Sequence, residues 1–328
     1  MKPLLIISLL FLIQPASAQW FKQTQGIMGT PINVELWADN QQHADRCIAQ
    51  VMDEMRRIDR TMSPYIDSSE LSQINQFAAQ HPVKISQELF DLIQRSIKLS
   101  ELSKGAFDIT FASVGHQYDY RKGKKPSEQD ISQQLDRINY RHLLLNAQKR
   151  TIAFAKPGVR IDLGGIANGH AVDNGIRLLK ACGFKQALVI AGGDSRILGD
   201  HQGRPWMTGI RDPRNKDKSI LVIPLSDTAL STSGDYERFF IQDGKRYHHI
   251  ISPQTGKSVA STRSVTILGP DATTTDGLST MIFVLGPQAG LRLIEQLPDI
   301  DAVIIDAKGK IQYSSGLMPP SRAEPTQK

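Results

Sequence analysis

The chain has 328 residues, of which 40% are hydrophobic and 22% charged, and its formal net charge is +6. These proportions support one large hydrophobic core or two moderate ones, and they exclude disordered and collagen-like classes. Apart from the run 121–125, which we interpret as a solvated loop, the basic residues are scattered. A nucleic-acid binder would concentrate them on one face, whereas a small phosphorylated ligand is compatible with this charge.

The first residues are typical of an export signal. Lys2 precedes the apolar run 4–13, which is too short to span a bilayer, and residues 16–18 are the small residues that a signal peptidase requires. We expect residues 1–18 to be a signal peptide cleaved before Gln19; the alternative is a retained membrane anchor. No cysteine follows the run, so we expect a soluble exported protein, periplasmic in a Gram-negative source.

Apolar periodicity places the elements of the first part of the chain. Alternation around Ile32 predicts a strand, whereas spacings of three and four predict helices, one of which ends at Gly105. The expected elements are a strand over 32–36, helices over 48–62 and 86–104, a hairpin of 142–146 with 151–155, a helix over 166–182 and a strand over 187–190.

The remaining chain is predicted to be rich in strands, with Asp243-Gly244 as a strong hairpin turn. Because strands cluster in hairpins, we predict an α+β fold with mainly antiparallel sheets. No repeat or linker divides residues 19–316, which are expected to form one compact unit, followed by a mobile tail over 317–328. The expected strands cover 206–210, 220–224, 239–242, 246–251, 265–268, 302–305 and 311–313, with a helix over 274–285.

The two cysteines, Cys47 and Cys182, both lie in helix-like stretches. They are too few for a disulfide scaffold and have no metal-ligand spacing. One disulfide and two separately buried thiols are both compatible with the sequence, so neither cysteine receives a role.

Two glycine-rich turns follow predicted strands. The segment 162–169, Asp-Leu-Gly-Gly-Ile-Ala-Asn-Gly, opens a helix, so its backbone can approach a ligand and its free N–H groups attract phosphate. It lacks the spacing of a dinucleotide fingerprint and the lysine of a P-loop, and a tight structural turn explains it equally well. The second turn, Gly192-Gly193-Asp194, is better explained as structural.

Two pairs of residues have catalytic chemistry. Asp276 and Thr280 are four residues apart and project from one helix face. Mg²⁺ accepts one carboxylate, one hydroxyl and one backbone carbonyl as ligands when phosphates and waters complete its coordination shell. Without further support, the aspartate is more simply explained as a helix cap. His248 and His249 lie at the end of a predicted strand, where neighbouring side chains point to opposite faces, so only one of them can face a given site. That histidine could act as a base for a hydroxyl nucleophile. The simpler alternative is one exposed and one hydrogen-bonded histidine. No Gly-x-Ser-x-Gly or cysteine nucleophile indicates a hydrolase.

Taken in order, the motifs resemble the ApbE family of FAD:protein FMN transferases, from about residue 28 to 286. The fold that this resemblance implies is α+β, similar to T-fold proteins. The matching motifs are Met28-Gly29-Thr30; Met62-Ser63-Pro64-Tyr65 with Ser69-Glu70-Leu71 and Asn75; Gly105-Ala106-Phe107-Asp108; 162–167; Gly192-Gly193-Asp194; 232–236; 249–256; and Pro270-Asp271-Ala272 leading to Asp276 and Thr280.

The resemblance implies an enzyme that binds FAD and Mg²⁺, transfers FMN to a threonine hydroxyl of an acceptor protein and releases AMP. The acceptors it implies are exported flavoproteins or membrane redox subunits, such as those of sodium-pumping NADH:quinone reductases, which would bring the enzyme to the inner membrane. By position, His249 would activate the threonine. Asn168 and Ser252 depart from the family pattern, which has lysine and Asp or Asn there. FAD would contact Met28, Tyr65, Ala106, Phe107, Asp108 and Asp162, and the metal would bind the Ala167 carbonyl, Asp276 and Thr280.

Two other functions are compatible with these motifs. An FAD pyrophosphatase would use the same site with water as the nucleophile, and the sequence does not separate it from a transferase. The second is a non-catalytic exported flavin-binding protein. The presence of Asp276, Thr280 and His249 argues against it, because storage of a flavin does not need them. The acceptor and the oligomeric state stay open.

Overall fold

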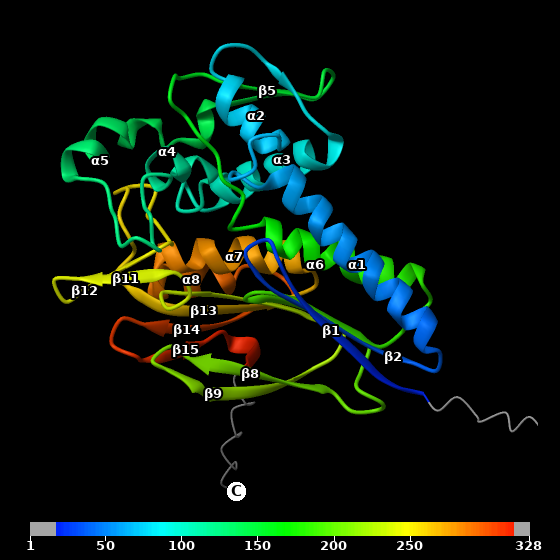
Figure 1. Cartoon of the computed structure of the whole chain (residues 1–328). Helices are drawn as coiled ribbons and strands as arrows, with labels where there is room; N and C mark the ends of the chain where they lie inside the picture. The colour runs from blue at the N-terminus through cyan, green and yellow to red at the C-terminus, as the bar shows by residue number, and fades with distance from the viewer. Residues whose placement is uncertain (1–17, 318–328) are drawn as a thin grey trace, which may run out of the picture.

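The computed structural model describes residues 18–317 (Figure 1). The predicted signal peptide, except Ala18, and the predicted tail, except Leu317, lie outside these residues. Within the described part, no helix combines the length and apolar character needed to cross a bilayer.

An eight-stranded sheet forms the base of the fold, in the order β1-β2-β6-β7-β10-β13-β14-β15 (Figure 1). All neighbouring strands are antiparallel, as predicted. Sequence analysis missed three of them, β1, β7 and β10. The strands are β1 (Gln19–Ile27), β2 (Thr30–Ala38), β6 (Ala187–Ala191), β7 (Asp194–Leu198), β10 (Ala229–Gly234), β13 (Thr262–Gly269), β14 (Asp301–Asp306) and β15 (Ile311–Tyr313).

Helices cover one face of this sheet (Figure 1). The first, α1, buries an apolar stripe that includes Ile48, Val51 and Met55, and each such side chain contributes about 1.5–3 kcal/mol of burial free energy. Most residues of α7 are buried, because it lies between the sheet and a further layer. These helices are α1 (Gln41–Met62), α6 (Ala167–Ala181), α7 (Ala272–Leu285) and α8 (Pro287–Ile294), whereas α3 (Gln87–Leu102) packs on α7 from the other side.

A second layer, from residues 70–154, lies on the far side of α6 and α7 from the sheet (Figure 1). It includes a three-stranded sheet in the order β3-β5-β4, whose hairpin of β4 and β5 was predicted. Its elements, besides α3, are α2 (Glu70–Phe77), β3 (Val83–Lys84), η1 (Ile109–Phe111), α4 (Ala112–Gly115), α5 (Glu128–Gln134), η2 (Leu135–Arg137), η3 (Tyr140–His142), β4 (Leu143–Asn146) and β5 (Thr151–Phe154).

Two hairpins project from the main sheet: β8 (Trp206–Asp212) with β9 (Asn215–Leu225), and β11 (Phe239–Gln242) with β12 (Lys245–His248). Asp243 and Gly244 both have positive φ, 51° and 72°, as the Asp-Gly turn predicts. The predicted strand 246–251 is wrong at its end. Strand β12 ends at His248. The His249 N–H still donates to the Arg238 carbonyl in register with β11, but beyond it the chain pairs with residues 257–259 instead.

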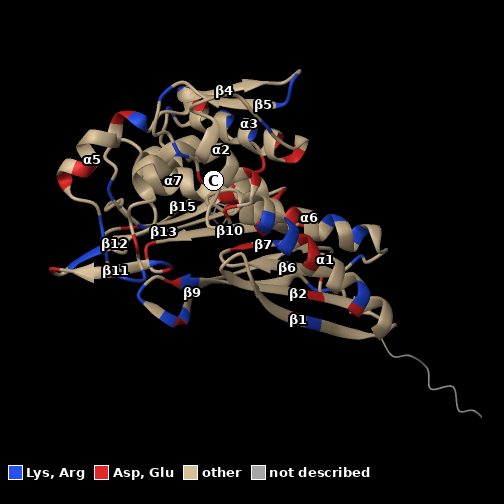
Figure 2. Cartoon of the chain, turned by 45° about the horizontal axis from the view of Figure 1, so that its top comes forward, with Lys and Arg blue, Asp and Glu red and all other residues tan. Residues whose placement is uncertain are grey.

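Polar contacts tie α1 and α3 to α6. Arg57 binds Glu54 and Glu88, and Glu88 also contacts His170 at 2.8 Å, so acidic and basic side chains alternate where these helices meet (Figure 2). The pKa of Glu88 is lowered by hydrogen bonds from His170 and Arg57 despite its partial burial. These bonds fix α6, which carries the glycine-rich motif at its start.

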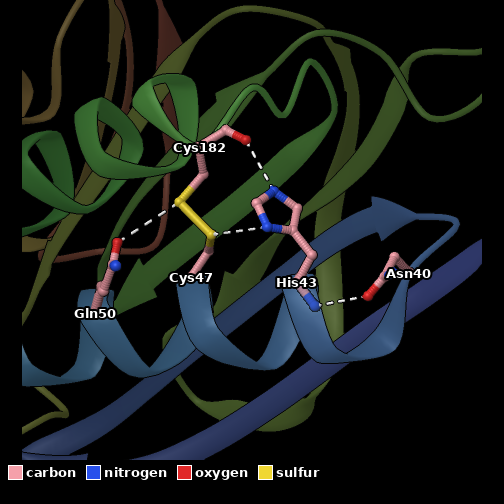
Figure 3. Close-up of a disulfide and its surroundings, with 5 residues drawn as sticks. All are labelled: Asn40, His43, Cys47, Gln50 and Cys182. Carbon is pink, nitrogen blue, oxygen red and sulfur yellow. Dashed lines mark hydrogen bonds between the residues drawn. A yellow bond between two sulfur atoms is a disulfide. The ribbon is translucent and has the colours of Figure 1, made fainter.

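Cys47 and Cys182 form a disulfide, which decides between the two alternatives that the sequence left open (Figure 3). It joins α1 to the residue that follows α6. His43 lies beside it, with Nε2 3.0 Å from the Cys182 carbonyl (Figure 3). The disulfide closes a loop with a sequence separation of 135 residues.

Candidate active site

Three motifs that lie far apart in the sequence meet at the turn before α6. A side chain at Gly165 would place its Cβ 3.2 Å from Thr280 Oγ1 and 3.3 Å from the Phe107 ring. The turn itself is held by Asp162, whose Oδ1 accepts a hydrogen bond of 2.6 Å from Gly164 N–H. The predicted FAD-binding segments and the predicted metal ligand Thr280 therefore lie together.

Helices α6 and α7 approach each other closely at Gly169. A Cβ there would lie 2.1 Å from the Ala272 carbonyl oxygen and 2.7 Å from Asp276 Cβ, so only glycine fits. Its N–H donates to Asp276 Oδ2 at 2.9 Å. Asp276 is thereby bound to the first turn of α6, the same turn that contains Ala167.

Asp276 and Asp194 form a pair of buried carboxyl groups, with 5% and 6% of their surface exposed. Burial raises the pKa of Asp194 to about 7, while the neighbouring Ser231 and Asn168 side chains act to lower it. Burial and repulsion by Asp194 raise the pKa of Asp276 well above its ordinary value. Neither carboxyl pairs with a lysine or arginine of residues 18–317.

These oxygens fit a hard divalent cation. Two buried carboxylates without a counter-charge are costly, and a cation between them removes that cost. Thr280 adds a hydroxyl 3.3 Å from Ser233 Oγ. In residues 18–317 no three His, Cys, Asp or Glu side chains are grouped to hold a metal, so the set depends on the Thr280 hydroxyl and the Ala167 carbonyl. Oxygen donors of this kind are those that Mg²⁺ accepts.

The other side of the site is open. Tyr65 is 86% exposed, and the charged groups that act on its hydroxyl include Asp162 and Arg238. Met28 and Gly29, both with positive φ, form the β1–β2 turn, and a Cβ on Gly29 would lie 3.7 Å from Arg238 Nη2. The exposed Arg238 guanidinium, which sequence analysis did not name, therefore lies near the β1–β2 turn, and its charge acts on Tyr65 and Asp162.

The segment 106–108 is buried. The Asp108 carboxyl accepts hydrogen bonds from Thr110 N–H at 2.9 Å, from Thr110 Oγ1 at 2.6 Å and from Tyr140 N–H at 2.7 Å. Burial raises its pKa. Asp108 therefore fixes the loop internally, and the Phe107 ring is the part of this segment that reaches Gly165.

His249 and His248 have different surroundings. The His248 ring is buried and bound, with Nε2 2.7 Å from the Val259 carbonyl. His249 Nδ1 is buried without a hydrogen-bond partner, next to Arg238. Burial, assisted by the charge of Arg238, lowers the pKa of His249 to about 3, so this imidazole is neutral at pH 7. A neutral, unpartnered imidazole can accept a proton from a hydroxyl.

Comparisons with known proteins identify the family of the chain. The sequence model of the ApbE family matches residues 28–304. The chain belongs to the ApbE family. It is 30% identical to the FAD:protein FMN transferase of Treponema pallidum, in an alignment that covers 92% of this chain and 89% of the relative. It is 31% identical to the FAD:protein FMN transferase of Vibrio cholerae, in an alignment that covers 89% of this chain and 90% of the relative.

Solved ApbE structures have the same fold. The crystal structure of the ApbE protein from Thermotoga maritima superimposes with a TM-score of 0.84 at 32% identity, covering 91% of this chain and 98% of that one. The structure of the flavin transferase ApbE from Vibrio cholerae superimposes with a TM-score of 0.81 at 28% identity and covers the same share of each chain. The α+β fold and the family resemblance predicted from the sequence are therefore confirmed.

The two departures from the ApbE pattern have clear structural places. The Asn168 side chain lies near the Asp194 carboxyl and acts to lower its pKa, so position 168 belongs to the surroundings of the acidic pair. Ser252 closes its turn through the backbone: its N–H donates to the Lys257 carbonyl at 2.8 Å, and its carbonyl accepts from Gly256 N–H at 2.8 Å. The turn after His249 therefore does not need an acidic side chain at position 252.

Proposed function

We propose that this ApbE-family protein transfers FMN from FAD to a threonine hydroxyl of an acceptor protein, with a divalent cation, and releases AMP. The curated relatives that align over most of the chain are named FAD:protein FMN transferases. The observation that carries the proposal is the meeting of Gly165, Thr280 and Phe107 beside the Gly169–Asp276 hydrogen bond. It joins the predicted flavin segments and the predicted metal ligands in one place.

In the proposed reaction, the threonine oxygen attacks the phosphorus on the FMN side of the diphosphate. The bond from this phosphorus to the bridging oxygen breaks, and AMP leaves with that oxygen. His249 is the base or the orienting group for this hydroxyl, because its neutral imidazole has an unpartnered nitrogen to which the hydroxyl can donate. The Ala167 carbonyl, Asp276 and Thr280 would hold Mg²⁺, which when bound neutralises charge on the phosphate oxygens.

We further propose that the protein is exported to the periplasm. The Cys47–Cys182 disulfide supports this location, because disulfides persist in oxidising compartments. The acceptor would then be an exported flavoprotein or the exposed part of a membrane redox-complex subunit. The enzyme would meet the inner membrane through that acceptor.

The test is incubation with FAD, Mg²⁺ and a candidate acceptor, beside an acceptor whose target threonine is replaced by valine. Flavin fluorescence on the denatured threonine acceptor, with one AMP released per flavin attached, is the expected result. Added EDTA should abolish it. Free FMN without labelled acceptor would identify a pyrophosphatase instead, and intact FAD after long incubation would identify a binding protein.

A further inference from the structure

The carboxylate of Asp173 joins the two helices that carry the proposed metal ligands. Asp173 lies on α6, and its side chain accepts three hydrogen bonds from the start of α7: from Ala272 N–H at 2.9 Å, from Thr273 N–H at 2.9 Å and from Thr273 Oγ1 at 2.5 Å. Arg196 of β7 donates to the same carboxylate at 2.5 Å. One side chain therefore links α6, α7 and β7.

Helix α7 does not need Asp173 to begin. Its N-cap is Asp271, which accepts from Thr274 N–H at 2.9 Å and pairs with Arg95 of α3 at 2.6 Å. Both aspartates thus bind free N–H groups of the same helix end. Of the two aspartates only Asp173 comes from α6, so only Asp173 adds to the Gly169–Asp276 hydrogen bond in setting the position of α7 relative to α6.

That relative position determines where the oxygen donors lie. The Ala167 carbonyl belongs to α6, whereas Asp276 and Thr280 belong to α7, and about a hundred residues of chain separate the two helices. Mg²⁺ requires ligand distances near 2.0–2.1 Å, so a small shift of one helix would move its oxygen ligands out of the coordination geometry. Arg196 extends the link to β7, whose first residue is Asp194.

We propose that Asp173 is a positioning residue that sets α7 against α6 and thereby the geometry of the divalent-cation site. Arg196 completes this contact. The inference rests on the proposed function, because it takes Ala167, Asp276 and Thr280 as the ligands. Asp173 itself touches neither the cation nor FAD in this assignment.

The experiment compares Asp173→Asn with Asp271→Asn in the full mature chain. The two are matched, since each aspartate binds N–H groups of α7 and pairs with one arginine. Mn²⁺ affinity, measured with the metal alone by electron paramagnetic resonance, and the thermal unfolding temperature are the readouts. Both variants should lose stability, but only Asp173→Asn should raise the Kd for Mn²⁺ by about tenfold or more.

A second pair separates positioning from simple charge. Arg196→Gln removes a positive charge near the site, which on electrostatics alone would tighten Mn²⁺ binding. Loss of positioning predicts weaker binding instead, while Arg95→Gln, which affects the Asp271 contact, should leave the affinity unchanged. This pair also carries the test if Asp173→Asn does not fold.

The outcomes are distinguishable. Wild-type Mn²⁺ affinity in Asp173→Asn, equal losses in Asp173→Asn and Asp271→Asn, or tighter binding in Arg196→Gln would each overturn the positioning role and leave the proposed function intact. A wild-type protein that binds no Mn²⁺ would overturn the metal site itself, and the inference with it.

Discussion

The two sides of the site are built in opposite ways. On the cation side, Asp194 and Asp276 are almost fully buried, and the Gly169 N–H donates a hydrogen bond to Asp276. On the flavin side, Tyr65 is 86% exposed, and the exposed Arg238 side chain has no hydrogen-bond or ion-pair partner in residues 18–317.

The difference follows from what each side has to bind. A small cation tolerates little variation in ligand distance, so its oxygens are fixed by packed helices at a cost in stability. A dinucleotide, followed by an acceptor protein, needs an open surface where side chains can adapt. Removing one of the two repelling carboxyl groups should therefore affect chemistry and stability in opposite directions, whereas changes on the open side should affect affinity alone.

The largest effect should come from Asp276→Asn. Transfer should fall by about a thousandfold or more, because a bound metal ion contributes several kcal/mol of charge stabilisation. In the absence of metal, the variant should nevertheless unfold at a higher temperature than the wild type, because the repulsion between the buried carboxyl groups of residues 276 and 194 is gone. Transfer assays and thermal unfolding measure the two effects. Full activity in this variant would remove the metal assignment.

The disulfide tests how firmly the cation side is anchored, since it holds the far end of α6. Replacing both cysteines by serine should lower the free energy of unfolding by about 3 kcal/mol, through a less constrained unfolded chain. Urea unfolding of the variant and of the oxidised and reduced wild type measures this. If reduction left the urea midpoint unchanged, the disulfide would not contribute to stability.

Tyr65→Ala tests the open side. The Kd for FAD should rise by about tenfold, the size of one aromatic stacking contact, while the unfolding temperature stays the same because the ring is exposed. Tyr65→Phe is the matched control and should bind FAD like the wild type. Quenching of flavin fluorescence measures both affinities, and equal affinity in Tyr65→Ala would place the flavin elsewhere.

The smallest effect concerns pH. The folded protein keeps His249 at a pKa of about 3, so between pH 3 and 6.5 the unfolded chain binds more protons than the folded one. The stability linked to this histidine is full above pH 6.5 and falls as the pH drops. Unfolding free energies from pH 7.5 to 4.5 should fall less steeply in His249→Gln than in the wild type. An unchanged slope would mean that His249 is not desolvated.

Much of the fold and of the candidate site could be predicted from local patterns. The spacing of apolar residues predicted α1, α3, α6 and α7, and the Asp-Gly turn predicted the β11–β12 hairpin, because these signals depend on neighbouring residues. Two of the missed strands lack such a pattern: β7 begins with the buried polar residues Asp194 and Ser195, and β10 is Ala-Leu-Ser-Thr-Ser-Gly.

The order of motifs along the chain was enough to indicate the family, and with it Asp276, Thr280 and His249 as site residues. Only the tertiary structure decided the Asp194–Asp276 pair, the Cys47–Cys182 disulfide, the internal role of Asp108 and the link that Asp173 makes. The reason is physical: each of these contacts joins residues tens to more than a hundred positions apart, and only the packing of helices on the sheet determines which of them meet.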